Sequence, residues 1–273
     1  MPHPRSAMLT LYGDYVLSRG GEIGVGSLIE LLSNFHISKQ AVRSAVSRMC
    51  RGGLLKAKRV KGKSYYSLTK KGQSLLIKGA ERIFQRKNTS WDEGWSIVTY
   101  SIPERLRRAR DTLRIELGWL GYGPLSGATW ISPYDLSKEV QEVVERLKIT
   151  EYVHIFNAKH QGYSDTKGIV NRCWDLPKIH DKYDHFLNKY RPELKNYLQR
   201  QKNGETIPAS ECFVRRFNLI HEYRRFPYYD PDLPGALLPE NWLRREAAAV
   251  FNQYHNLLAE KADEYFDSVF KSY

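Results

Sequence analysis

Cations and small polar side chains of the kind that bind nucleic acid recur at helical spacing in residues 38–51. The outward face of this predicted helix has a lysine at its start and then a glutamine, two serines and three arginines: Lys39, Gln40, Arg43, Ser44, Ser47, Arg48 and Arg51. Guanidinium groups bind phosphates and guanine edges, and glutamine and serine hydrogen-bond to bases. A solvated helix normally mixes both signs of charge, because i,i+4 ion pairs stabilise it. The acid-free face therefore favours a recognition helix for the DNA major groove over an ordinary exposed helix.

The opposite face of the same helix indicates how it is held. Its apolar residues follow the i, i+3, i+4, i+7 pattern of a helix packed on a core: Val42, Ala45, Val46 and Met49. Ser38 stands where a side-chain oxygen can cap the first turn, and Ile37 and Val42 occupy the two positions of a hydrophobic staple. We therefore expect a helix that begins after Ser38 and presents its cations outward.

A second group of cations follows in a predicted hairpin, residues 54–68. Two β-prone runs flank the basic tip Lys61-Gly62-Lys63. The hairpin carries five cations: Lys56, Lys58, Arg59, Lys61 and Lys63. Such a wing can lie along the DNA backbone or reach a minor groove. Tyr65 and Tyr66 either pack or stack on bases, and packing is favoured because aromatic residues dominate core energetics.

Three further helices are predicted around these two elements. The first is indicated by apolar spacing and ends at Gly20-Gly21: Leu9, Tyr12, Tyr15 and Val16. The second follows a capping box formed by Ser27 and Glu30, and its apolar residues are Leu28, Ile29, Leu31, Leu32 and Phe35. Thr69 opens a fourth helix, with apolar positions Leu75, Leu76, Ala80, Ile83 and Phe84. We expect this last helix to lead from the N-terminal region, residues 1–90 and called the head below, to the rest of the chain.

The net charge of the protein is confined to this head. Residues 1–90 contain 17 Lys and Arg against 4 Asp and Glu, whereas residues 91–273 contain 26 of each, and the formal net charge is +13. This distribution predicts a polyanion-binding domain over residues 1–90, joined to a neutral body. The chain has neither a signal-peptide core nor an apolar run long enough to span a membrane, so a cytoplasmic protein is expected.

Strand and helix patterns alternate in residues 91–165, the predicted middle domain. Strands are expected over 95–102, 123–132 and 151–156, and helices over 104–120 and 137–147. One further strand would complete a βαββαβ, ferredoxin-like arrangement, so the fold class is α+β. Many functions occur on this fold, and the fold by itself names none.

A metal-dependent nuclease is the alternative function from a different class. Such an enzyme needs carboxylates that converge at a strand end to hold a cation such as Mg²⁺. Ser101 occupies that place after the first middle strand, and the other acids are scattered: Asp111, Asp135, Asp165 and Asp175. Cys50, Cys173 and Cys212 have no zinc-ligand spacing. We therefore predict no catalytic residues, no metal site, no cofactor and no enzyme activity.

Residues 166–273 predict a mainly helical domain, with helices over 182–200 and 242–270. Two strings stand out, Arg-Cys-Trp-Asp-Leu at 172–176 and the Pro-rich and aromatic stretch 221–242. An ordered loop with tyrosine, tryptophan and paired arginines can line a pocket for a molecule with an apolar and an anionic part. The same residues equally fit a second hydrophobic core or a dimer interface.

These two strings, together with residues 39–51 and the strand 95–103, resemble the PaaX family of phenylacetic acid catabolism repressors. The resemblance covers nearly the whole chain, and the stretch 221–242 is its most specific part. It implies a winged helix-turn-helix domain, a middle domain similar to the small CRISPR adaptation nuclease, and a helical C-terminal domain. Ser101 stands where that nuclease has a metal-binding acid, so a dimerisation role rather than nuclease activity is expected for the middle domain.

The resemblance also implies partners. It implies a homodimer that binds a palindromic operator in double-stranded DNA and is released by phenylacetyl-coenzyme A. The expected ligand residues are arginines for phosphates, with aromatic and imidazole side chains for the acyl group and its surroundings: Arg172, Trp174, His221, Tyr223, Arg224, Arg225 and Trp242. A third interpretation is a non-specific architectural DNA binder. Its affinity for DNA would not depend on the base sequence but would depend strongly on the salt concentration.

Overall fold

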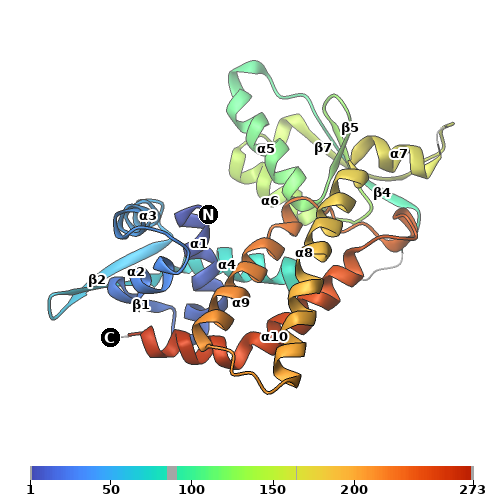
Figure 1. Ribbon diagram of the computed structural model, residues 1–273. Helices are drawn as coiled ribbons and strands as arrows, with labels where there is room; N and C mark the ends of the chain where they lie inside the picture. The colour runs from blue at the N-terminus through green and yellow to red at the C-terminus, as the bar shows by residue number, and fades with distance from the viewer. Residues whose placement is uncertain (1, 85–90, 164, 272–273) are drawn as a thin grey trace. The chain divides into compact units, whose positions relative to one another are not determined.

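The computed structural model describes residues 2–84, 91–163 and 165–271 (Figure 1). The chain divides into two compact units. The first comprises residues from 1–85, 185–224 and 244–273, and the second comprises residues from 86–184 and 225–243. Within the described chain, no helix is long and apolar enough to cross a membrane.

Three helices form the start of the first unit. Helix α1 (Pro4–Leu11) continues through a π-helical turn (Tyr12–Val16) and a 3-10 turn (Leu17–Arg19), and it ends at Gly20 in the left-handed conformation. Helices α2 (Val25–Ser33) and α3 (Lys39–Arg51) follow. The first three predicted helices are therefore confirmed.

The capping box predicted at Ser27 is wrong. The N-cap of α2 is Gly24, and Ser27 lies buried within the first turn. Its hydroxyl donates to the carbonyl of Val269 at 2.7 Å, and the same oxygen accepts from the N–H of Lys271 at 3.2 Å. The side chain therefore hydrogen-bonds to backbone groups near the C-terminal end of the chain, a contact that no local sequence pattern reveals.

A three-stranded antiparallel sheet completes the head. It contains β1 (Glu22–Gly24), β2 (Leu55–Val60) and β3 (Lys63–Leu68) in the order β1-β3-β2. Lys61 and Gly62 form the two-residue turn between β2 and β3, with φ of 48° and 79°. Two positive φ values are what a tight hairpin turn of this length requires, and glycine meets them without strain. The predicted hairpin is confirmed, with Lys63 as the first residue of β3.

Helix α4 (Lys70–Phe84) follows Thr69, whose hydroxyl accepts from the N–H of Gly72 at 3.1 Å. The predicted start is therefore confirmed, but the predicted apolar face is only partly buried. Leu75 is 45% exposed, and Leu76, Ala80 and Ile83 are half-buried. The side chain of Phe84 lies outside the described residues.

Three helices from the C-terminal half belong wholly or partly to the first unit. They are α8 (Leu176–Lys202), α9 (Ala209–Tyr223) and α10 (Arg244–Val269), and α9 and α10 pack along each other (Figure 1). The helices predicted over 182–200 and 242–270 are confirmed, although α8 begins six residues earlier. Helix α8 runs through Pro192 and contributes to both units.

The second unit contains the predicted βαββαβ order. Its elements are β4 (Gly94–Tyr100), α5 (Arg107–Leu120), β5 (Gly123–Ser126), β6 (Thr129–Ser132), α6 (Ser137–Leu147) and β7 (Val153–Lys159). All pairs are antiparallel, in the order β5-β6-β4-β7. The single strand expected over 123–132 is wrong, because Gly127 turns the chain at φ 48° and makes it a hairpin. That hairpin supplies the missing fourth strand.

The core of this unit lies between the sheet and its two helices. Val98 of β4, Leu113 and Leu117 of α5 and Val140 of α6 are fully buried in it. Helix α7 (Thr166–Cys173) contacts β5. The end of α7 approaches Gly123 of β5 so closely that a Cβ on this glycine would stand 2.6 Å from the Trp174 ring and 2.7 Å from Cβ of Cys173.

We expect Gly123→Ala to destabilise the second unit by about 1–3 kcal/mol, since overpacked sites force side chains and backbone to shift. Urea unfolding followed by tryptophan fluorescence measures this. Gly118→Ala on α5 is the matched control, because nothing lies within 4 Å of its Cβ position. That change should raise stability by up to about 1 kcal/mol through helix propensity. Equal stability of the two variants would contradict the close approach at Gly123.

Candidate nucleic-acid interface

Helix α3 separates its two faces as the sequence predicts. The Oγ of Ser38 accepts from the N–H of Ala41 at 3.2 Å, which confirms the cap. The core side is buried: Val42, Ala45, Val46 and Met49 are at most 2% exposed. The opposite side is exposed: Lys39, Gln40, Arg43, Ser44, Ser47, Arg48 and Arg51. The amphipathic helix therefore turns its cations to solvent.

The arginines of α3 are available to a partner. Arg43, Arg48 and Arg51 form no ion pair with any residue that the structure describes. Neutralisation must then come from solvent ions or from a bound anion. A helix with three such groups on one face matches the phosphates and base edges of a duplex groove.

The β2–β3 hairpin extends the basic surface. The side chains that the sequence assigns to DNA are exposed there: Lys58, Arg59, Lys61 and Lys63, together with Lys56. Tyr65 and Tyr66 are half-buried. The hydroxyl of Tyr12 in the π-helical turn donates to the carbonyl of Tyr66 at 2.9 Å, so the first helix and β3 are joined.

The turn before α3 is anchored on the C-terminal helices. Phe35 stacks on Phe217 of α9 with ring centroids 3.9 Å apart, and Ile37 is buried. Between them, His36 adopts a left-handed φ of 57°. The direction in which α3 leaves this turn therefore depends on the position of α9.

The candidate ligand residues of the first unit lie at the end of α9. Tyr223 is buried and stacks on Phe251 at 4.0 Å. His221 Nδ1 lies 2.7 Å from the hydroxyl of Thr10, and the Arg224 guanidinium donates to Ser6 of α1. These three residues are thus close together, and two of them already contact α1.

The other candidate ligand residues belong to the second unit. Trp174 is buried and stacks on Trp95 at 6.3 Å, while Arg172 is exposed. Arg225 is exposed and donates to the hydroxyl of Tyr229 at 2.9 Å. The ring of Trp242 meets Tyr183 edge-on at 5.9 Å. The structure thus divides the seven residues between its two units.

Three models of known protein families match successive parts of the chain. A family model described as PaaX-like protein matches residues 3–72, one described as the PaaX protein central Cas2-like domain matches residues 88–170, and one described as the PaaX-like protein C-terminal domain matches residues 174–268. The chain belongs to the PaaX family. It is 30% identical over 260 residues to the transcriptional repressor PaaX of Escherichia coli, which covers 94% of this chain and 81% of that protein.

One solved structure supports the fold of this PaaX family member. The uncharacterized protein Rv0674 from Mycobacterium tuberculosis is similar with a TM-score of 0.60 and 20% sequence identity, over 97% of each chain. The family models and the 30% identical relative confirm the family that the sequence predicted. A curated relative that represses transcription supports a DNA-binding regulator of this family and does not favour the nuclease. Ser101, where a nuclease would need an acid, lies exposed directly after β4.

A buried charge network joins the head of this PaaX family member to α9 and α10, and no sequence pattern indicated it. Arg216 of α9 lies 3.1 Å from Asp14 Oδ2 and 3.2 Å from Asp263 Oδ2. The side chains of Arg216 and Asp14 are only 8% and 6% exposed. Burial alone would lower the pKa of Arg216, but the carboxylates of Asp14 and Asp263 outweigh it and hold the pKa above its ordinary value. The guanidinium therefore stays charged.

His255 of α10 completes the network. Its Nε2 lies 3.1 Å from Nε of Arg216 and 3.1 Å from Oδ1 of Asp14. The nitrogen can accept from Arg216 in one tautomer or donate to Asp14 in the other, but a single nitrogen cannot do both. Asp14 falls on the side of the predicted first helix opposite Leu9 and Val16, so its position carried no local signal of a buried partner.

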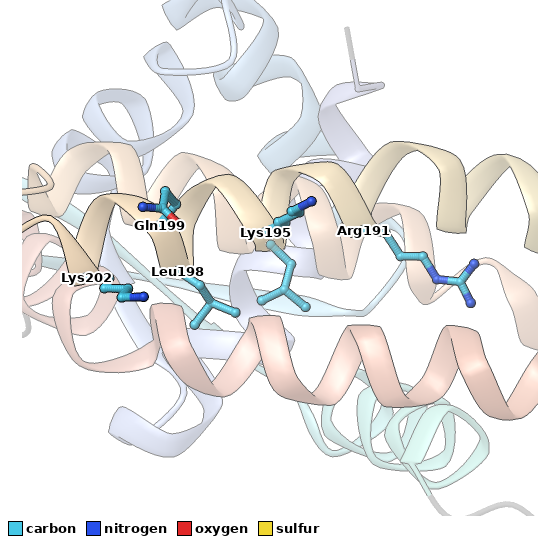
Figure 2. Close-up of a pocket in the computed structure, with 6 residues that line it drawn as sticks. Arg191, Lys195, Leu198, Gln199 and Lys202 are labelled. Carbon is cyan, nitrogen blue, oxygen red and sulfur yellow. The ribbon is translucent and has the colours of Figure 1, made fainter.

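An open groove along α8 contains none of the candidate ligand residues (Figure 2). It is lined by one face of the helix: Arg191, Leu194, Lys195, Leu198, Gln199 and Lys202. Arg191 pairs with Glu246 of α10. The groove therefore adds a basic, partly apolar stripe on the first unit but does not join the residues predicted to bind an effector.

Proposed function

We propose that this chain is a sequence-specific DNA-binding repressor that works as a homodimer in the cytoplasm. The outward face of α3 carries the proposal, because its arginines are exposed and lack acidic partners in the described chain. The adjoining basic hairpin and the membership of the PaaX family support it. By this family relationship, the genes it controls are those of phenylacetate catabolism.

We infer a three-domain organisation from the same features. Three helices and a β1-β3-β2 sheet with a basic hairpin fit a winged helix-turn-helix domain over residues 1–90. The βαββαβ order with an antiparallel β5-β6-β4-β7 sheet fits a ferredoxin-like domain over 91–165 that serves dimerisation. Residues 166–273 form the helical domain that binds the effector.

In the proposed complex, α3 enters the major groove. Arg43, Ser44, Ser47 and Arg48 reach base edges and phosphates there, with Lys39, Gln40 and Arg51 at either end of the contact. The wing cations bind phosphates: Lys58, Arg59, Lys61 and Lys63. A two-fold dimer places two such heads on a palindrome, and both bind at once only if their spacing matches whole turns of DNA.

The proposed effector is an acyl-coenzyme A, specifically phenylacetyl-coenzyme A. The candidate contacts are Arg224 and Arg225 for its phosphates and Trp174, Tyr223 or Trp242 for its phenyl group, with Arg172 and His221 as further candidates. The indole N–H groups of Trp174 and Trp242 are buried and have no acceptor among the described residues. Buried donors of this kind normally find a partner, so they favour a polar ligand such as a thioester carbonyl.

Selection from a random pool of DNA duplexes tests the proposal. We expect a palindromic sequence to be enriched, with a preference over unrelated duplex of about 4–10 kcal/mol at physiological salt. Phenylacetyl-coenzyme A should release it, and free coenzyme A serves as the control ligand. Uniform recovery of all sequences would point to the architectural binder, and cleavage of the duplex in Mg²⁺ that stops with chelator would point to the nuclease.

A further inference from the structure

We infer that α1 acts as a latch. Ser6 and Thr10 of α1 hydrogen-bond to the side chains of Arg224 and His221, and an anionic ligand that binds these two side chains displaces Ser6 and Thr10. This inference rests on the proposed function and names the regulation of its effector site. It concerns four residues of one unit, so it depends only on the contacts within that unit.

Three polar contacts form the latch. The Arg224 guanidinium donates through one nitrogen to the carbonyl of Ser6 at 2.8 Å and to its hydroxyl at 2.5 Å. His221 Nδ1 lies 2.7 Å from Oγ1 of Thr10. Ser6 and Thr10 are four residues apart and therefore share one face of α1. The end of α9 thus holds that face at two consecutive turns.

The same two side chains have the chemistry to bind a phosphate group. A guanidinium binds a phosphate through two parallel N–H donors, and an imidazole adds a third donor. Arg224 cannot present both donors to a phosphate while one nitrogen is held by Ser6. Ligand binding and latch contacts therefore compete, which gives the ligand a higher affinity for the unlatched state, as release of DNA requires.

A continuous set of contacts connects the latch to α3. Helix α1 packs on both α3 and α9. On the other side, His221 stacks on Phe217 with ring centroids 5.5 Å apart, and Phe217 stacks on Phe35 in the turn before α3. Movement at the end of α9 therefore reaches the recognition helix through its neighbour α1 and through the turn from which it starts.

Calorimetric titration of the full chain with phenylacetyl-coenzyme A tests the latch. The variants are Ser6→Ala and Thr10→Val, which remove one hydroxyl each and preserve helix and volume. Because each removes one hydrogen bond that the ligand must break, we expect the Kd for the ligand to fall about threefold to tenfold. The affinity for operator DNA should fall in the same variants, since the latched state is the one that binds DNA.

Asn34→Ala is the matched control. Its side-chain amide donates to the hydroxyl of Tyr265 at 3.1 Å, so it also joins the head to α10, through a contact that involves none of the four latch residues. An unchanged ligand Kd in Asn34→Ala, with lower values in the latch variants, supports the competition. An equal fall of the ligand Kd in all three variants would show that the first unit is loosened in general, and it would overturn the latch.

The remaining outcomes separate the latch from the proposed function. If wild type and latch variants bind both ligand and operator with the same affinities, the latch is wrong and the repressor stands. If wild type binds operator but gives no heat with phenylacetyl-coenzyme A, both the latch and the proposed effector are wrong. If wild type binds no duplex sequence preferentially, the proposed function itself fails.

Discussion

Replacing Arg216 with alanine is expected to lower the free energy of unfolding of the first unit by about 3–5 kcal/mol, the range for breaking a buried ion pair. The reason is the burial of Asp14, which is 6% exposed and, among the described residues, would keep only His255 as an ion-pair partner. A carboxylate held away from water without its main counterion strongly favours the unfolded chain. Asp14→Asn should be less severe, because the amide is neutral and keeps one acceptor oxygen.

Urea unfolding can assign this loss to the correct unit. All six tryptophans belong to the second unit, so their fluorescence reports that unit alone, whereas far-UV circular dichroism follows the helices of both. The Arg216→Ala transition should move mainly in the dichroism signal. Arg191→Ala is the control, because its pair with Glu246 is about half exposed and should contribute at most about 1 kcal/mol. A loss no larger than that of the control would show that the buried network adds little to stability.

Loss of the α3 arginines should have the second largest effect. We expect Arg43→Ala and Arg48→Ala each to weaken binding to the selected operator by about 1–3 kcal/mol, because a bidentate contact to a base edge is lost. Both side chains are exposed and unpaired within the described chain, so neither change should affect folding. Gel shifts at fixed salt, with operator and unrelated duplex, measure affinity and specificity together.

The pattern of loss across sequences distinguishes base contacts from phosphate contacts. An arginine that reads a base should lose operator affinity more than affinity for unrelated duplex, whereas a phosphate contact weakens both alike. Arg108→Ala on α5 is the control, since Arg108 is an exposed arginine of the second unit. Unchanged operator affinity in the Arg43 and Arg48 variants would remove α3 as the recognition helix.

The features that the sequence predicts well are those set by neighbouring residues. The cap at Ser38, the two faces of α3 and the tight turn at Gly62 depend on contacts within about four positions along the chain. Periodicity and turn chemistry report such contacts directly. The exposed basic surface, which combines a helix face and a hairpin, could therefore be predicted as a whole.

The features that it could not predict depend on distant partners. Asp14 and Arg216 are separated by 202 positions, and Ser27 bonds to a carbonyl 242 positions away. A serine three residues before a glutamate is a good local signal for a helix cap. Here, however, the serine hydroxyl forms a tertiary hydrogen bond instead of capping the helix. Helix α9 was not separated from the Pro-rich stretch that follows it. Its last turn carries His221 and Tyr223, and Arg224 is its C-cap, so the contacts of the proposed latch also escaped sequence reasoning.

The joint between the head and the C-terminal helices limits how far the protein can be dissected. Tyr15 stacks on Phe266 at 4.8 Å and Phe35 on Phe217, so a fragment that stopped after α4 would leave these aromatic rings in water. Such a fragment would tend to aggregate or partially melt. The head proposed to bind DNA therefore cannot be transferred alone to another protein, and hybrid regulators made by exchanging heads would also need the matching surfaces of α9 and α10.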